Sequence, residues 1–174
     1  MGDDHFELYL SAAAIAARIK ELGAEIEKDY AGKRPIFIGI LNGAFIFLAD
    51  LIREVDLDVE MDFFKLSSYG DAKISSGNVQ LLKSVDAKLA GRDIIVVEDI
   101  VDSGLSMNYI RRQLLTLRPA SLRFCTLLYK EEVAKLEFEV DYIGFKIPKH
   151  FVIGYGLDYQ QLKRNLKDIY KLAE

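Results

Sequence analysis

Two acidic residues, Glu98 and Asp99, directly follow the four apolar residues 94–97, and a short polar segment comes soon after them. Residues 103–106 read Ser-Gly-Leu-Ser and stand where the apolar spacing predicts the start of a helix. Backbone N–H groups at a helix N-terminus attract anions, serine hydroxyls can add donors, and Gly104 leaves room for a phosphate beside the backbone. Carboxylates beside a phosphate site would repel the ligand unless they hold sugar hydroxyls or a bridging Mg²⁺. The two features together therefore describe a site for a phosphorylated sugar.

The same residues also allow a purely structural interpretation. Asp102 could cap the start of the helix, as aspartate often does, while Glu98 and Asp99 could simply be exposed to solvent. Two adjacent acids directly after an apolar run are less ordinary than an acidic cap. From the residues alone, both interpretations stay open.

Short apolar runs alternate with stretches of helical spacing along the chain. The strands predicted from this pattern are residues 36–41, 59–66, 94–97 and 122–128, with shorter candidates at 142–145 and 151–155. The predicted helices are one that Ser11 caps and that ends at about residue 30, one at 44–55, and one at 105–117 whose inner stripe is Met107, Ile110, Leu114 and Leu117. We therefore expect an α/β fold with a mostly parallel sheet that helices cover on both faces. Ligands of such sheets bind beyond the carboxyl ends of the strands, which directs attention to residues 41–43, 98–106 and 129–131.

Residues 67–78 form the longest stretch with few side chains that could pack. Long loops in compact domains often serve as lids over an active site. A mobile hairpin tip would have the same composition, and composition alone favours this plainer interpretation.

The composition favours a single domain over residues 1–174, since a chain of this length with 51% hydrophobic residues can bury one sizeable core. The net charge of −4 and the scattered lysines and arginines give no support to nucleic-acid or membrane binding. The only cysteine, Cys125, lies in an apolar run, which predicts a buried thiol and a reducing compartment such as the cytoplasm.

Several other classes of site lack their sequence patterns. No apolar stretch is long enough to span a membrane, and the first residues do not have the pattern of a secretory signal. Neither a P-loop nor a dinucleotide-binding fingerprint is present, and no histidine or cysteine pair has the spacing of a zinc site.

Five segments carry a resemblance to a known family. They are Leu41-Asn42-Gly43-Ala44-Phe45, Leu66-Ser67-Ser68-Tyr69-Gly70, residues 94–107, Leu127-Leu128-Tyr129-Lys130, and residues 151–159 with Arg164. In this order they closely resemble the motifs of the type I phosphoribosyltransferases, and specifically of the hypoxanthine (hypoxanthine-guanine) phosphoribosyltransferases. The resemblance extends from about residue 36 to about residue 170. It implies a mostly parallel twisted sheet flanked by helices, with a small hood formed by the terminal segments.

The resemblance implies that Leu41, Asn42 and Gly43 belong to a pyrophosphate-binding loop in which the Leu41–Asn42 peptide bond is cis. Many relatives have a basic residue in place of Asn42, so only the role of the backbone carries over to this chain. Ser68 and Tyr69 resemble the start of a mobile loop that closes over the pyrophosphate and excludes water. By this resemblance, residues 67–78 are a lid.

The resemblance also assigns the contacts of the sugar phosphate. Glu98 and Asp99 would bind the ribose hydroxyls, directly or through Mg²⁺. The 5′-phosphate would be held by Asp102, Ser103, Gly104, Leu105 and Ser106. Asp158 matches an acid near the Mg²⁺ of the pyrophosphate, so the expected metal-binding residues are Glu98, Asp99 and Asp158. Arg164 matches an arginine that contacts the pyrophosphate itself.

The remaining matches concern the purine base. Lys130 matches a lysine that contacts the 6-oxo group, although a lysine after a strand is otherwise most simply a surface residue. Phe151 would stack on the base and Val152 would present backbone groups to its edge, with Leu157 in the same segment. Aromatic residues on strands such as Phe151 otherwise usually pack in the core. Asp102 would face N7 of the purine as the catalytic proton acceptor or donor.

Taken together, these matches imply transfer of ribose 5-phosphate from 5-phosphoribosyl 1-pyrophosphate to N9 of hypoxanthine, with guanine as a second expected base. The products would be IMP or GMP and pyrophosphate, in purine salvage, with Mg²⁺ as cofactor and a homodimer or homotetramer as the assembly. One alternative keeps the fold and changes the base, to xanthine or to a broad range of 6-oxopurines. A second is a regulator that senses a nucleotide and binds RNA, which the scattered basic residues disfavour. A third is a binding module with a decayed site, which the matched acids and Lys130 disfavour.

Overall fold

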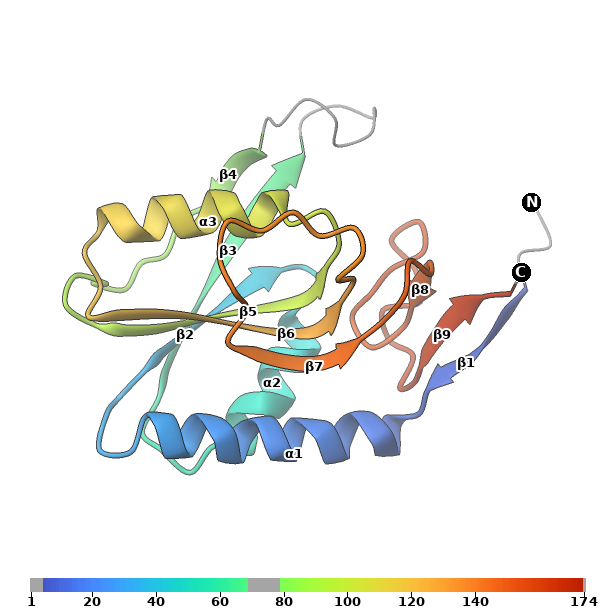
Figure 1. Ribbon diagram of the computed structural model, residues 1–174, viewed down its shortest axis with the longest axis horizontal. Helices are drawn as coiled ribbons and strands as arrows, with labels where there is room; N and C mark the ends of the chain where they lie inside the picture. The colour runs from blue at the N-terminus through green and yellow to red at the C-terminus, as the bar shows by residue number, and fades with distance from the viewer. Residues whose placement is uncertain (1–4, 69–78, 174) are drawn as a thin grey trace.

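A six-stranded sheet with helices on both faces forms the body of the structure (Figure 1). The computed structural model describes residues 5–68 and 79–173. The strands of the sheet are β2 (Ile36–Leu41), β3 (Glu60–Ser68), β4 (Val79–Lys83), β5 (Asp93–Val101), β6 (Ser121–Tyr129) and β7 (Tyr142–Lys146). Their order is β4-β3-β2-β5-β6-β7, and all neighbours run parallel except β3 and β4. The mostly parallel sheet expected from the sequence is confirmed.

Two helices cover one face of the sheet and a third covers the other (Figure 1). The first two are α1 (Ala12–Asp29) and α2 (Phe45–Arg53), and the third is α3 (Leu105–Thr116). Ser11 caps α1 as predicted, because its side chain accepts a hydrogen bond from the backbone of Ala14 at 3.2 Å. Successive residues of a strand point to opposite faces. In β5, accordingly, Ile95 packs in the core cluster with α1 and α2, and Val96 packs in the cluster with α3.

The structure corrects several predicted boundaries. Strand β5 does not end at residue 97 but continues to Val101, since its pairing with β6 continues to Tyr129. Glu98 and Asp99 therefore lie within a strand rather than in a turn. The candidate strand at 151–155 is shortened to β8 (Val152–Ile153). Leu117, predicted on the inner stripe of the third helix, is 46% exposed because α3 ends one residue earlier.

A separate three-stranded antiparallel sheet forms the hood that the family resemblance implied. Its strands are β1 (Phe6–Leu10), β9 (Ile169–Leu172) and β8, in the order β1-β9-β8. The chain segments near the two ends thus lie side by side, as Figure 1 shows. The parallel strands of the large sheet point their carboxyl ends towards this hood (Figure 1). The expected ligand-binding ends of the strands and the hood therefore face each other.

Strand β7 is the outermost strand on one side of the large sheet, and α1 covers it. Arg18 of α1 donates hydrogen bonds to two consecutive carbonyl groups of this strand, those of Ile143 at 2.7 Å and Gly144 at 3.0 Å. Cys125 is buried in the core, as predicted, and burial raises the pKa of its thiol. Among the described residues, no helix is long and apolar enough to cross a membrane.

Candidate active site

Three chain segments meet at the carboxyl ends of β2 and β5. The loop after β2 contains the cis peptide bond between Leu41 and Asn42, as the resemblance implied. A side chain at Gly43 would overlap the carboxylate of Asp99, so only glycine fits at this contact. Gly156, with a φ of +99°, lies against the carbonyl oxygen of Gly43, and a side chain there would overlap that oxygen. The predicted pyrophosphate loop, the acidic pair and the C-terminal motif are therefore packed directly on one another.

The acidic pair is buried rather than solvated. Glu98 and Asp99 are each 8% exposed, so the interpretation of both as solvent-exposed acids is wrong. Burial raises the pKa of Glu98 well above its usual value, and the neighbouring charge of Asp99 adds to the rise. Burial also raises the pKa of Asp99, although hydrogen bonds and the charge of Arg164 oppose the rise. A buried, negatively charged pair is costly unless a cation or hydroxyl groups compensate it.

The donor set of this pair suits Mg²⁺. Among the described residues, no group of three or more histidine, cysteine, aspartate or glutamate side chains could hold a metal ion. Mg²⁺ is usually bound by one or two protein carboxylates together with water and substrate oxygens, so it does not need a larger protein cluster. Glu98 and Asp99 are adjacent carboxylates next to the loop expected to hold the pyrophosphate. They fit a metal that is shared with the substrate.

The predicted phosphate loop begins α3 without a side-chain cap. The N-cap is Gly104, with a φ of +83°, so Asp102 is not the cap and that structural alternative is wrong. A side chain at Gly104 would also approach Leu136 to 2.7 Å. The first backbone hydrogen bond of the helix runs from Asn108 to Gly104 at 3.0 Å. The N–H of Leu105 donates weakly to the hydroxyl oxygen of Ser103 at 3.4 Å, and the N–H groups of residues 106 and 107 lie ahead of the helical ladder, where they are suited to an anion.

Asp102 and Lys130 form an ion pair at the ends of β5 and β6. The distance from Lys130 Nζ to Asp102 Oδ2 is 3.0 Å. Lys130 is buried, at 7% exposure, so its interpretation as a surface lysine is wrong. The side chain of Asp102 is 61% exposed. N7 and the 6-oxo group lie on the same edge of a purine, so two groups this close together could contact both atoms at once.

Asp158 and Arg164 are also brought together. Arg164 forms an ion pair with Asp158 at 3.0 Å, and it donates to the carbonyl oxygen of Gly156 at 2.8 Å. Gly156 in turn contacts Gly43. The guanidinium group is therefore held beside the predicted pyrophosphate loop, where its charge also acts on Asp99.

The residue expected to stack on the base lies in an aromatic group of the hood. Phe151 is 47% exposed, so it is not a core residue. Its ring centroid lies 6.3 Å from that of Phe6 and 6.1 Å from that of Tyr159. Val152 and Leu157, which belong to the same motif, are buried. Sequence reasoning missed Phe6, although the apolar and charged alternation of residues 6–8 is a weak signal for a strand.

The lid residues are described only in part. Ser68 ends β3 and pairs with Val79 of β4, whereas Tyr69 lies outside the described residues. Residues 67 and 68, which were expected in the loop, belong to β3; the rest of the expected loop lies outside the described residues, and its role as a lid stays a prediction.

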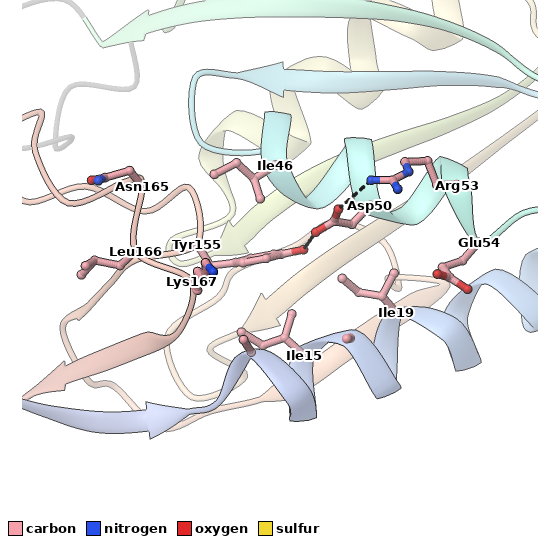
Figure 2. Close-up of a pocket in the computed structure, with 12 residues that line it drawn as sticks. Ile15, Ile19, Ile46, Asp50, Arg53, Glu54, Tyr155, Asn165, Leu166 and Lys167 are labelled. Carbon is pink, nitrogen blue, oxygen red and sulfur yellow. Dashed lines mark hydrogen bonds and ion pairs between the residues drawn. The ribbon is translucent and has the colours of Figure 1, made fainter.

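A cavity of about 460 Å³ lies apart from the predicted site residues (Figure 2). It is bounded by α1, α2, Tyr155 and residues 165–167. No residue predicted for the site lines it. Tyr155, which the sequence suggested could pack in the core, is buried and donates its hydroxyl hydrogen bond to Asp50 of α2.

The chain is similar to known proteins over nearly its whole length. A sequence profile described as the phosphoribosyl transferase domain matches residues 5–160. The hypoxanthine-guanine phosphoribosyltransferase of Bacillus subtilis is 42% identical over 166 residues, which cover 95% of this chain and 92% of that protein. The protein of the same name from Aquifex aeolicus is 41% identical over 97% of this chain and 95% of its own length. A crystal structure of the hypoxanthine phosphoribosyltransferase of Staphylococcus aureus matches with a TM-score of 0.92 at 40% identity, covering 96% of this chain and 91% of that one. The chain therefore belongs to the hypoxanthine-guanine phosphoribosyltransferases, a family of transferases.

Proposed function

We propose that this protein transfers ribose 5-phosphate from 5-phosphoribosyl 1-pyrophosphate to N9 of hypoxanthine or guanine in purine salvage, releasing pyrophosphate. The observation that carries the proposal is the direct packing of Gly43 on Asp99 and of Gly156 on Gly43. This contact brings together the acid expected to bind the sugar, the loop expected to hold the pyrophosphate, and the segment that carries Arg164. Family membership supports the same activity.

Mg²⁺ would be held by Glu98 and Asp99, with Asp158 on the pyrophosphate side. Bound there, the ion would neutralise charge on the leaving pyrophosphate oxygens. The chain contributes the rest of the electrostatics through Arg164, whose guanidinium lies next to the loop that follows β2. Such fixed charges stabilise a transition state without having to reorganise during the reaction.

Breaking the glycosidic bond builds positive charge on the ribose ring, as in other reactions with an oxocarbenium-like transition state. The buried carboxylates Glu98 and Asp99 would favour this cation. Water competes with the base for the ribose cation, so a lid that includes Ser68 and Tyr69 would protect it.

The base is oriented by three groups from two parts of the fold. Phe151 stacks on the ring from the hood, and the ammonium group of Lys130 donates to the 6-oxo oxygen. Asp102 takes the proton from N7 while N9 forms its bond to the sugar. Holding the base in line with the sugar supplies a large part of the rate.

The contact with Lys130 separates 6-oxopurines from adenine, because the 6-amino group of adenine is itself a donor. It does not separate hypoxanthine from xanthine. The values of kcat/KM for hypoxanthine, guanine and xanthine, measured side by side, distinguish the proposed preference from the xanthine alternative.

The test of the function is pyrophosphate release from 5-phosphoribosyl 1-pyrophosphate with each purine in turn, with and without Mg²⁺. Release with hypoxanthine that requires Mg²⁺ is expected. Absence of release with all purines, together with RNA binding in a gel shift at physiological salt, would instead establish the regulator alternative. The single domain, the cytoplasmic location and a homodimer or homotetramer complete the proposal.

A further inference from the structure

A partly buried hydrogen bond connects two segments that are 105 residues apart in the sequence. The hydroxyl group of Tyr155 donates to Oδ2 of Asp50, which is on α2. Figure 2 shows the tyrosine ring reaching from the C-terminal motif to this helix, with Asp50 also facing Arg53. Tyr155 is 7% exposed, so its hydroxyl group needs a partner inside the protein.

Both ends of this hydrogen bond are attached to the predicted pyrophosphate site. Helix α2 begins at Phe45, directly after the loop that contains Asn42 and Gly43. On the other side, Tyr155 directly precedes Gly156, which contacts Gly43 and accepts a hydrogen bond from Arg164. The two segments therefore meet at two places: at the contact of the two glycines and at the bond between Tyr155 and Asp50.

Apolar packing and the hydrogen bond act together where these segments meet. A cavity of about 460 Å³ lies beside the bond and is lined by Ile15, Ile19 and Ile46 together with Tyr155 and Asp50 (Figure 2). The pocket is partly open to the surface, and Tyr155 packs in the same apolar cluster as Ile15 and Ile19. Apolar contacts have no preferred direction, so the hydrogen bond adds the directional contact between the two segments. Burial and the bond to Asp50 raise the pKa of Tyr155, so the hydroxyl keeps its proton and stays a donor.

We propose that Tyr155 and Asp50 are positioning residues for the pyrophosphate group of the substrate, a role that rests on the proposed function. They hold α2, and with it the loop of residues 41–43, at a fixed distance from the segment that carries Asp158 and Arg164. Neither side chain touches the substrate. Their loss would change the binding of the pyrophosphate group and leave the base site unchanged.

The experiment compares Tyr155→Phe and Asp50→Ala, which remove the bond, with Asp50→Asn, which keeps an oxygen acceptor. For the first two variants, the KM for 5-phosphoribosyl 1-pyrophosphate should rise about tenfold, the size expected for one hydrogen bond. Their kcat and their KM for hypoxanthine should stay within about twofold of the wild-type values, since uniform binding energy is lost. Asp50→Asn should restore the KM to within about twofold of the wild-type value.

Tyr142→Phe is the matched control. Tyr142 is also buried and also donates to an aspartate of a helix, Asp29, at 2.7 Å, but this pair lies at the opposite ends of the strands. It should lower stability without changing either KM. A second readout needs no substrate: amide hydrogen exchange in residues 45–50 should accelerate in Tyr155→Phe and not in Tyr142→Phe.

The outcomes separate the inference from the function on which it rests. If the wild-type protein releases pyrophosphate but Tyr155→Phe and Asp50→Ala keep the wild-type KM, the inference is wrong and the function stands. An equal rise in both KM values, or the same rise in Tyr142→Phe, would show a general structural role and would also refute it. Absence of pyrophosphate release by the wild-type protein refutes the function and the inference together.

Discussion

The ion pair between Asp102 and Lys130 places a carboxylate and an ammonium group side by side at the ends of two neighbouring strands. Each residue has an ordinary explanation by itself, as a helix cap and as a surface lysine. The structure excludes both explanations, because Gly104 is the cap and Lys130 is buried. Burying a lysine beside an aspartate is costly for stability. The arrangement is understandable if the pair serves the substrate.

Substitution of Asp102 by asparagine tests its role in moving a proton. Asp102→Asn keeps the shape of the side chain and removes its ability to take the proton from N7. We expect kcat to fall about 10²-fold, a usual loss for general acid–base catalysis. Binding of IMP, measured by calorimetry, should be retained. A kcat close to that of the wild type would show that Asp102 does not take the proton from N7.

Substitution of Lys130 by methionine tests the recognition of the 6-oxo group. Lys130→Met keeps most of the apolar stem and removes the charged donor, so kcat/KM for hypoxanthine should fall about 10- to 100-fold. Lys146→Met is the matched control, because Lys146 also pairs with an acid, Glu131, but both side chains are more than half exposed. It should leave kcat/KM unchanged. Equal effects of the two substitutions would contradict the assignment.

At the scale of the elements, the site depends on backbones that approach one another closely. The loop after β2, strand β5 and the C-terminal motif meet at Gly43 and Gly156, where side chains would overlap neighbouring oxygen atoms. The loop and the C-terminal motif come from opposite halves of the sequence. The hood lies beyond the carboxyl ends of the strands (Figure 1), and the C-terminal motif reaches the loop after β2 through the contact of Gly156 with Gly43.

Substitution of Gly43 by alanine should therefore damage the site more than the fold. The added methyl group must displace the Asp99 carboxylate, so kcat/KM for 5-phosphoribosyl 1-pyrophosphate should fall by about 10²-fold, the size expected for a misplacement of about 1 Å. Gly32→Ala is the control: its φ of +74° makes alanine unfavourable, but no atom lies within 4 Å of the added carbon. That variant should lose about 1–2 kcal/mol of stability and keep full activity. Full activity of Gly43→Ala would show that the loop and Asp99 are not coupled.

At the scale of the whole molecule, the sequence predicted the body of the fold well because the central strands are buried on both faces and read as continuous apolar runs. It ended the strand of Glu98 four residues early, since pairing with β6, not local hydrophobicity, continues β5 to Val101. Strands β1, β4 and β9 were not predicted, because short strands with mixed polar residues have a weak pattern.

Less of the candidate site than of the fold could be predicted from the residues alone. The acids and the phosphate loop follow from residue types, and the roles of Lys130, Phe151 and Arg164 came from the family resemblance. The bond between Tyr155 and Asp50 and the contribution of Phe6 to the aromatic group were missed. Such contacts join distant parts of the chain, and no local pattern in one sequence reports them.

The stability of the whole molecule should depend on pH through Asp62. Burial alone would raise the pKa of this carboxyl group, but hydrogen bonds from three backbone N–H groups and from Lys83 outweigh burial and lower it. The bond from Lys83 links β3 to β4, and those from Asp86 and Ala87 link β3 to the segment after β4. A lowered pKa in the folded state gives a stabilisation that is complete above the pKa of the unfolded chain and is lost as the pH falls through the folded value.

The corresponding variant is Asp62→Asn. At pH 7 it should lower the free energy of unfolding by about 1.5–3 kcal/mol, the range for hydrogen bonds to a charged group. The difference from the wild type should shrink as the pH falls below about 4, where the wild-type carboxylate also takes up a proton. Urea unfolding at several pH values measures it. A difference that stays constant with pH would mean that the charge of Asp62 does not contribute.

The two hydrogen bonds from Arg18 to the outermost strand β7 have a consequence for self-association. An unprotected outer strand offers its carbonyl groups as a template on which a strand from another molecule can be added, and this is a common start of fibril growth. In this protein, the guanidinium group already occupies two consecutive acceptors of that strand. A foreign strand would first have to displace an arginine that is also paired with Glu21 and Glu25. The arginine therefore protects this edge of the sheet against the addition of a foreign strand.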